Sequence, residues 1–496
     1  MTINPLETTS GAPPTAEAAE LEVPFVVGGR WVTGRETRYE SRDTGTIFWT
    51  PPLDLDVLVT SRSDPVPAFD LSTAEVIDFL VATGRALNLE ENRYLSDALD
   101  HMARVHPAGR RILSACYGSL ARAFDRDSLE FQVQNELGGP DVLDRWRVVE
   151  HPAGSLTDPL ASGRGRSAIR AMPPRLIHVM AGNGPQVAAM TIVRGALTKG
   201  VHVLKMASND LFTATAILRT MADIEPDHPV VRSFSAVYWR GGDESVESAL
   251  FRSQWFDKLV AWGGHSAMRS ALRYLGPGFQ LIAFDPKVSI SLIGHEAFNS
   301  QAILNEAVRL AAWDVTMLNQ DGCACSRYQF IEASSTDVDR YCGLLSAELA
   351  MDTPLAAGIA PPPPSEIRDH VDVLRYLEPE YRIWGSCDGR GLVIRSDKPV
   401  DFHPDGKTVN VIPVKSLPDA IRYVSAATQT VGVFPRERKT ALRNGLASAG
   451  AQRVVTLGGA GGLALGLPQD AMYPLHRFVL WAVDEDVAET SPGSGL

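Results

Sequence analysis

The hydrophobic pattern is most regular between residues 175 and 290, where short apolar runs alternate with stretches of helical spacing. From Gln186 the apolar residues follow a helical spacing, and Pro185 and Gly200 suit the start and the position just past the end of that helix. Strands alternating with helices predict a parallel sheet with helices on both faces, which binds a nucleotide at the carboxyl ends of its strands. The runs that predict these strands are 176–180, 201–206, 234–239, 256–262 and 279–284.

Outside residues 175–290, shorter apolar patterns predict further strands and helices. Before this region the pattern predicts strands at 24–32 and 55–61 and a largely helical stretch at 73–123. After it, the predicted elements are strands at 288–294, 407–414 and 452–459, a helix at 299–313 and a surface loop at 360–366. Because 496 residues exceed a single hydrophobic core, about two or three domains are expected.

Composition and charge narrow the classes of partner. The chain is 45% hydrophobic and 21% charged, which is typical of a soluble globular protein. Its net charge of -12 argues against nucleic acid and anionic membrane surfaces as partners. The first residues carry no signal or transit pattern, and no run approaches the roughly 18 apolar residues of a spanning helix, so a cytoplasmic location is expected.

Two of the five cysteines stand in the segment NQDGCACSR, residues 319–327. A thiol in a small, flexible segment is a candidate nucleophile for acyl carbons, while a free cysteine is equally often a small buried hydrophobe. The segment alone leaves both interpretations open for Cys323 and Cys325. No metal site is expected, because the eleven histidines show no spacing that would complete a ligand set with this pair.

Two glycine-rich segments are candidates for binding phosphate. Gly263 and Gly264 follow the run 256–262 and precede a predicted helix, as a phosphate-binding turn requires. The segment GGAGGLALG, residues 458–466, is a poor dinucleotide fingerprint because no helical pattern follows it, and we expect a mobile loop there.

The order of motifs is more specific than any one of them. AGNGP, LKMAS, LVAWGG, NQDGC, KTVN and QTVGV follow one another across residues 175–481. This order resembles the acyl-coenzyme A reductase family typified by the bioluminescence fatty-acid reductase, a branch of the aldehyde dehydrogenase superfamily. The resemblance implies an α/β, aldehyde dehydrogenase-like fold with a Rossmann-type parallel-sheet cofactor domain and an α/β catalytic domain.

The same resemblance divides the chain. Residues 1–22 are expected to form a disordered tail, because their composition buries little apolar surface. The other expected divisions are an N-terminal region at 23–174 that packs on the cofactor domain, a nicotinamide-cofactor-binding domain at 175–290, a catalytic domain carrying the cysteine at 291–460, and a C-terminal return segment and tail at 461–496.

The resemblance assigns catalytic roles to two residues. Cys323 follows an Asn-Gln pair by four residues, as the acyl-accepting nucleophile of the family does, so Cys325 becomes its bystander. Asn183 matches the asparagine whose side-chain amide helps to form an oxyanion hole, here together with the backbone amide of Cys323. Without the resemblance, Asn183 would be assigned to an ordinary turn.

Four residues match cofactor-binding positions. Lys205 and Ser208 stand where the superfamily holds the adenosine ribose, and Gly263 and Gly264 stand where it supports the pyrophosphate. Ser208 carries no charge that would repel a 2′-phosphate, and Lys205 can pair with one. The resemblance therefore implies NADPH as the cofactor, with NADH as the alternative.

Two differences from the residue pattern of the superfamily bear on which reaction is predicted. Hydrolytic aldehyde dehydrogenases carry a glutamate that activates water, but residues 280–290 hold none, and Asp285 before Pro286 suits a turn. In the segment 468–475, Gln469 and Ala471 replace two members of the His-Asp-Gly triplet expected in the reductases. The absent glutamate favours reduction of the acyl group over its hydrolysis.

The predicted activity is the reduction of an acyl thioester, carried by coenzyme A or an acyl carrier protein, to an aldehyde. Two alternatives stay open. One is an aldehyde dehydrogenase working in the oxidative direction, and the other is a non-redox subunit that binds acyl groups or acts as a scaffold. The resemblance also leaves a homo-oligomer open, since relatives commonly form dimers or tetramers through an exchanged strand.

Overall fold

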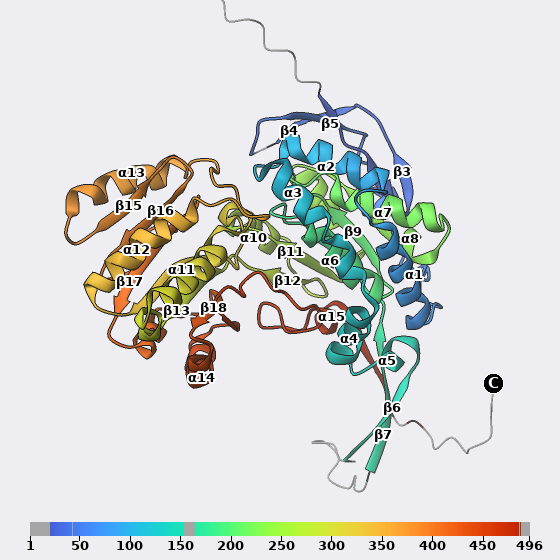
Figure 1. Cartoon of the computed structure of the whole chain (residues 1–496). Helices are drawn as coiled ribbons and strands as arrows, with labels where there is room; N and C mark the ends of the chain where they lie inside the picture. Colours follow the sequence, from blue (N-terminus) through green and yellow to red (C-terminus); the bar gives the residue numbers. More distant parts are fainter. Residues whose placement is uncertain (1–19, 42, 153–163, 486, 488–496) are drawn as a thin grey trace, which may run out of the picture.

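The computed structural model describes residues 20–41, 43–152, 164–485 and 487 (Figure 1). Two seven-stranded sheets dominate it, and two three-stranded sheets accompany them. Most of the expected N-terminal tail lies outside the described residues. Its last two residues form strand β1 (Leu21–Glu22), with Leu21 buried, so the tail assignment extended too far at this end.

The first large sheet has the order β12-β11-β8-β9-β10-β2-β3. Its first five members are mutually parallel, which confirms the predicted alternation of strands and helices. Sequence order reverses between β8 and β11, and a reversal of this kind opens a crevice at the carboxyl ends of the strands. These strands are β8 (Arg175–Val179), β9 (Val201–Lys205), β10 (Phe234–Val237), β11 (Lys258–Trp262) and β12 (Gln280–Phe284).

Helices of this region follow the strands closely. Helix α6 (Gln186–Leu197) starts at the predicted residue and is buried along most of its length, because it packs between the sheet and the N-terminal helices. The other helices are α7 (Thr213–Ile224), α8 (Pro229–Arg232), α9 (Glu244–Leu250) and α10 (His265–Leu272).

The N-terminal region shares one hydrophobic core with the first sheet. The helical prediction for 73–123 is confirmed by α1 (Thr73–Ala86), α2 (Arg93–Val105), α3 (Gly109–Tyr117) and the 3-10 helix η2 (Leu120–Phe124). Two further helices follow, α4 (Arg126–Leu137) and α5 (Asp141–Asp144). Strands β4 (Thr37–Glu40) and β5 (Ile47–Thr50) form a small sheet with β1.

Two strand predictions in this region need correction. The segment 24–32 is a hairpin of β2 (Phe25–Val27) and β3 (Arg30–Val32), because the glycine pair between them takes φ values of 53° and 77°. The segment 55–61 is not a strand. It contains the 3-10 helix η1 (Asp56–Leu58), where the Asp54 carboxylate accepts a hydrogen bond from the Asp56 amide and favours a turn.

The second large sheet has the order β15-β16-β17-β14-β13-β18-β19, parallel except for the pair β15-β16. Hydrophobic clusters cover it on two faces. Its strands are β13 (Val288–Ile293), β14 (Ser326–Glu332), β15 (Arg382–Ser386), β16 (Gly391–Arg395), β17 (Thr408–Val414), β18 (Thr428–Phe434) and β19 (Arg453–Thr456). Its α-helices are α11 (Gln301–Thr316), α12 (Ser335–Leu349), α13 (Ser365–Leu374) and α14 (Lys439–Ala449).

The C-terminal segment returns to the first half of the chain. Strand β20 (Leu480–Asp484) pairs with β7 (Arg164–Met172), which also pairs with β6 (Arg147–Pro152), and β6 and β7 project from the main body in Figure 1. Before β20, the short helix α15 (Pro474–Phe478) packs on α4. No helix in the described part of the chain is long and apolar enough to cross a membrane.

Candidate active site

A cleft of about 2940 Å³ runs along the carboxyl ends of the first sheet and reaches the cysteine segment. Its walls come from both large sheets and from the N-terminal helices. All six residues singled out in the sequence line this cleft, namely Asn183, Lys205, Ser208, Gly263, Gly264 and Cys323. The fold therefore brings together residues that lie up to 140 positions apart in the chain.

The cysteine segment begins with a turn of unusual backbone. Leu318, Asn319 and Gln320 have φ values of 51°, 56° and 75°, a left-handed conformation that costs free energy in residues other than glycine. The Gln320 amide holds the turn in place, because Nε2 donates to the Thr408 carbonyl at 2.8 Å and Oε1 accepts from the Thr408 amide at 2.9 Å. The Asn-Gln pair before the cysteine thus shapes the segment.

Cys323 presents its side chain to the cleft. The side chain is exposed, although protein surrounds the sulfur on its other sides. Ser289 of β13 donates to the Cys323 carbonyl at 2.6 Å and fixes the backbone. Loss of solvation raises the pKa of the Cys323 thiol, the nearby carboxylate of Asp470 raises it further, and a hydrogen bond from Gln429 lowers it. The thiol is accessible, and the groups around it control its ionisation.

Cys325 has the opposite surroundings. Its side chain is 1% exposed and packs with Met317 and Ala460. The thiol donates to the Met317 carbonyl at 3.2 Å, and burial raises its pKa to about 12. A thiol so protonated and enclosed is a poor nucleophile, so the geometry favours Cys323 of the two.

Asn183 lies in the turn that joins β8 to α6. Its Nδ2 donates to the carbonyl of Asp321 at 3.1 Å, which brings the carboxamide beside the segment that carries Cys323. The turn itself is tight at Gly182, where an added Cβ would stand 1.7 Å from Oδ1 of Asn209. Only a residue without a side chain fits at position 182, so the approach of Asn183 to the cysteine is set by the backbone.

Lys205 and Ser208 lie at the end of β9. The Lys205 ammonium is 5.4 Å from the centre of the Tyr238 ring, and an added Cβ at Gly241 would stand 3.8 Å from it. Lys205 therefore reaches the turn after β10, which also carries the exposed, cleft-lining Arg240. We did not single out Arg240 from the sequence, because a lone arginine after a strand has no distinguishing pattern.

Gly263 and Gly264 link β11 to α10 at the floor of the cleft. Gly263 has a φ of 145°, and an added Cβ there would crowd Ala267 at 3.2 Å. An added Cβ at Gly264, the N-cap of α10, meets no atom within 4 Å. The first turn of α10 is thus open to the cleft, an arrangement that suits a bound phosphate.

Two further residues touch the cysteine environment. Gln429 of β18 donates from Nε2 both to the Cys323 sulfur and to Oδ1 of Asp470, each at 3.1 Å. Gln429 is the first residue of the QTVGV motif, and Asp470 is the retained middle member of the expected His-Asp-Gly triplet. Sequence reasoning quoted both motifs but gave neither residue a role.

Comparison with known proteins decides the family. Residues 68–481 match the acyl-CoA reductase (LuxC) family. The chain belongs to this family. The long-chain acyl-protein thioester reductase of Vibrio harveyi is 25% identical over 481 residues, covering 94% of each chain. That of Photorhabdus laumondii is 29% identical over 423 residues, covering 83% of this chain and 82% of the relative.

Solved structures identify the fold of this LuxC-family chain. The NADP-dependent glyceraldehyde-3-phosphate dehydrogenase from Bacillus halodurans, solved in complex with NADP, superposes with a TM-score of 0.66 at 13% identity. The match covers 94% of this chain and 100% of that chain. The predicted aldehyde dehydrogenase-like fold is thereby confirmed.

The glycine-rich segment 458–466 of this LuxC-family chain is held by specific contacts, in contrast to the mobile loop that we expected. Oδ2 and Oδ1 of Asp314 accept hydrogen bonds from the amides of Gly458 and Ala460 at 2.8 and 3.0 Å. The guanidinium of Arg453 donates to the carbonyls of Gly459, Ala460 and Gly462. The next α-helix, α15, begins only at Pro474.

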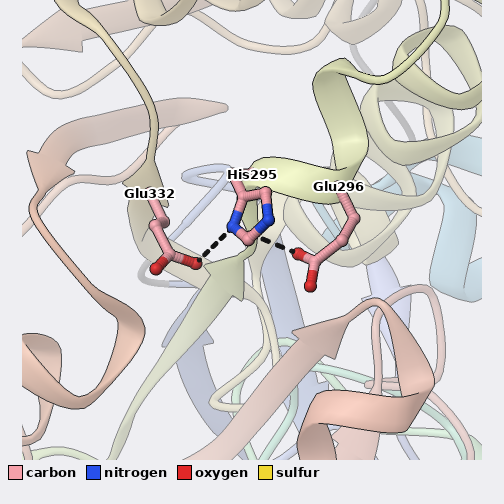
Figure 2. A group of neighbouring side chains, drawn as sticks. All are labelled: His295, Glu296 and Glu332. Carbon is pink, nitrogen blue, oxygen red and sulfur yellow. Dashed lines mark hydrogen bonds and ion pairs between the residues drawn. The ribbon is translucent and has the colours of Figure 1, made fainter.

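One group of side chains in the described residues has the composition of a metal site. His295 and Glu296, just past the end of β13, lie together with Glu332, the last residue of β14 (Figure 2). Arg438 makes ion pairs with both glutamates, so a guanidinium offsets part of their negative charge. The group lies past the end of β13 opposite to Ser289 and Cys323, and we interpret it as an ion-pair cluster.

Proposed function

We propose that this chain reduces an acyl thioester to an aldehyde with NADPH, through a covalent acyl group on Cys323. The observation that carries the proposal is the shared cleft, which exposes the Cys323 sulfur and extends along the strand ends to Lys205 and Gly264. A nucleophile and a nucleotide crevice in one cleft allow an acyl group and a hydride donor to meet. The names of the relatives, acyl-protein thioester reductases, agree with this chemistry.

The first step is transfer of the acyl group. Cys323, as thiolate, attacks the thioester carbon, and the oxyanion that forms accepts hydrogen bonds from Asn183 Nδ2 and the Cys323 amide. Collapse of this tetrahedral species expels the carrier thiolate, which takes up a proton, and leaves an acyl-enzyme thioester. Because the leaving group is itself a thiolate, the step needs little general acid assistance.

The second step converts the acyl-enzyme to aldehyde. A bound nicotinamide cofactor supplies a hydride to the acyl carbon. Asn183 and the Cys323 amide again hold the oxyanion, and breakage of the carbon–sulfur bond releases the aldehyde and regenerates the Cys323 thiolate. Preorganised donors of this kind are typically worth about 100-fold or more in rate each.

The cleft residues fit the cofactor NADPH. Lys205, Arg240 and Ser208 offer two cations and a hydroxyl near the end of β9, a donor set that suits a 2′-phosphate. Two of the cleft-lining carboxylates accept hydrogen bonds from the protein, Asp43 from Asn209 and Glu247 from the Gly242 amide. The first turn of α10 would hold the pyrophosphate, and NADH is the alternative cofactor.

Residues 280–290, where the hydrolytic aldehyde dehydrogenases carry their water-activating glutamate, hold Asp285 as their one carboxylate. Asp285, which follows β12, is exposed and lies 3.9 Å from the ammonium of Lys287. Because residues 280–290 hold no glutamate that could activate water, hydrolysis of the acyl-enzyme is expected to be slow. This argument favours reduction over the oxidative alternative with an acid as product.

The test is to mix pure protein with NADPH and acyl thioesters of several chain lengths, on coenzyme A and on acyl carrier protein. Loss of nicotinamide absorbance with stoichiometric aldehyde supports the proposal and identifies the preferred carrier. Oxidation of free aldehyde to acid with NAD would instead support an oxidative dehydrogenase. Failure to bind either nicotinamide cofactor would support a non-redox acyl-binding subunit.

Two further parts of the proposal have separate tests. A homo-oligomer is tested by light scattering of the purified protein, in which a mass of about twice or four times the chain mass of 53.8 kDa would support it. The cytoplasmic location is tested by fractionation of cells that produce the protein.

A further inference from the structure

Gln429 donates hydrogen bonds to both the Cys323 sulfur and Asp470. This pair of contacts points to a role for the loop 468–475, to which the sequence assigned none. We propose that Asp470 is a positioning residue that fixes the orientation of the Gln429 side-chain amide, so that an N–H group faces the Cys323 sulfur. This inference rests on the proposed function, in which Cys323 is the acyl-accepting nucleophile.

The chemistry of an amide gives Asp470 this influence. A glutamine side chain presents either its NH2 group or its oxygen to a neighbour, and the two orientations have nearly the same shape. An ionised carboxylate only accepts hydrogen bonds, so Asp470 selects the orientation in which Nε2 faces it at 3.1 Å. The same Nε2 lies 3.1 Å from the sulfur, where an N–H donor stabilises a thiolate and a carbonyl oxygen would stabilise a thiol.

The loop is built to hold Asp470 in place. Gln469 and Met472 exchange two backbone hydrogen bonds, of 2.9 and 3.1 Å, around a turn whose tip is Asp470 and Ala471. Both tip residues have positive φ, of 49° and 60°, which is unfavourable for alanine and better tolerated by aspartate. Backbone strain at Ala471, next to a carboxylate that contacts Gln429, is consistent with a functional constraint on the turn.

Both sides of the loop are anchored to helix α4. Asn135 donates to the Gly466 carbonyl at 2.7 Å, and Glu136 accepts from the Leu475 amide at 2.6 Å. Helix α15, which follows the turn, packs on α4 (Figure 1). The position of the Asp470 carboxylate therefore depends on a rigid element of the N-terminal region.

The charged groups around the pair define the controls. Besides Asp470, the ionisable neighbours of the cysteine sulfur are Cys325 and Arg453. The charged side chains that act on Asp470 are Lys287, Asp285 and Arg194. Loss of the Asp470 charge alone would lower the pKa of Cys323, whereas loss of the Gln429 donor would raise it. These opposite signs make a double-mutant cycle informative.

The experiment measures the rate of iodoacetamide alkylation of Cys323 against pH in the full chain, with mass spectrometry to confirm the labelled residue. The variants are Gln429→Ala, Asp470→Ala and the double variant, all made with Cys387→Ser, since Cys387 is the other cysteine with partial exposure. We expect Gln429→Ala to raise the Cys323 pKa by about one unit. In the Gln429→Ala background, Asp470→Ala should lower the Cys323 pKa, because Asp470 then acts on the sulfur only through its negative charge.

With Gln429 present, Asp470→Ala also lets the Gln429 amide reverse its orientation. The change that Asp470→Ala causes in the Cys323 pKa should therefore differ by about half a unit or more between the two backgrounds. Asp285→Ala, which removes a carboxylate with no hydrogen bond to Gln429, should combine additively with Gln429→Ala. If Asp470→Ala does not fold, Asp470→Asn replaces it, since asparagine can donate to a reversed Gln429 amide.

Equal Asp470→Ala changes in both backgrounds, or no alkylation of Cys323, would overturn the inference. The alkylation assay uses neither acyl donor nor cofactor. Unequal changes in a protein that reduces no thioester would therefore support the inference and refute the proposed function.

Discussion

Asn183 donates a hydrogen bond from Nδ2 to the backbone carbonyl of Asp321, at 3.1 Å. This contact joins the turn after β8, in the first sheet, to the segment that carries Cys323. Asp321 lies 138 residues after Asn183 in the chain. In the proposed function, this carboxamide donates to the oxyanion that forms at Cys323, two residues after Asp321.

Replacement of Asn183 by alanine should lower the turnover of acyl thioester by about 100-fold or more, because one donor to the oxyanion is lost. Alkylation of Cys323 by iodoacetamide forms no oxyanion and should change little. Gln186→Ala, at the first residue of α6 and on the same cleft wall, is the matched control and should retain most of the activity. An Asn183→Ala variant with full turnover would remove this residue from the mechanism.

In the proposed function, the preference for NADPH over NADH depends on the cleft wall that carries Lys205 and Arg240. Lys205→Ala should raise the KM for NADPH by about tenfold or more, through loss of a charge-assisted contact, and leave kinetics with NADH nearly unchanged. Ser208→Glu should weaken NADPH selectively, because the new carboxylate repels a 2′-phosphate. Equal losses with both cofactors would mean that this wall does not contact the 2′ position. The measurement is kcat/KM for each cofactor at a saturating acyl donor.

Burial raises the pKa of Glu136 to about 7. The neighbouring Arg194 and the hydrogen bond from the Leu475 amide lower this pKa but do not outweigh the effect of burial. The folded state therefore holds this proton up to a higher pH than the unfolded chain, where the pKa is 4.5. Its contribution to stability is present below pH 4.5 and is lost as pH rises through about 7, by roughly 3 kcal/mol in all.

Glu136→Gln removes this dependence on pH while retaining an acceptor for Leu475. Relative to the midpoint of the variant, the denaturation midpoint of the wild type should be lower at pH 8 than at pH 5. A difference between the two proteins that is the same at both pH values would contradict the assignment.

Ala471→Gly tests the strain in the turn that carries Asp470. Because Ala471 has a φ of 60°, glycine should stabilise the fold by about 1 kcal/mol, measured by chemical denaturation. Ala464→Gly, in the preceding loop and without a positive φ, should destabilise it slightly. Stabilisation at both positions would show that strain at residue 471 is not the cause.

The sequence predicted the elements whose apolar period is strong. Helix α6 and the five parallel strands of the first sheet follow from local patterns. The helix and four of these strands are buried along most of their length, whereas the edge strand β12 is partly exposed. Segment 55–61 has a comparable apolar content but lies at the surface, where the side chain of Asp54 favours a turn. Local hydrophobicity does not reveal which runs find a partner strand.

The candidate site was predictable only in part, for a related reason. Asn183 and Gly264 stand in motifs that follow strands, where a parallel sheet gathers its functional residues. Cys323 lies between helix α11 and strand β14, and its role came from the resemblance. Gln429 lies 106 residues after Cys323, and its contact depends on the register of β18 beside β13. Asp470 depends on a turn of positive φ at residues that are not glycine, which no sequence pattern indicates.

The most direct test of covalent reduction through Cys323 is a single-turnover experiment with radioactive acyl-coenzyme A. The wild type and Cys325→Ala should each retain close to one acyl group per chain after denaturation, and addition of NADPH before quenching should release it as aldehyde. Cys323→Ala should retain none. Labelling of Cys323→Ala, or its loss in a folded Cys325→Ala variant, would contradict the account.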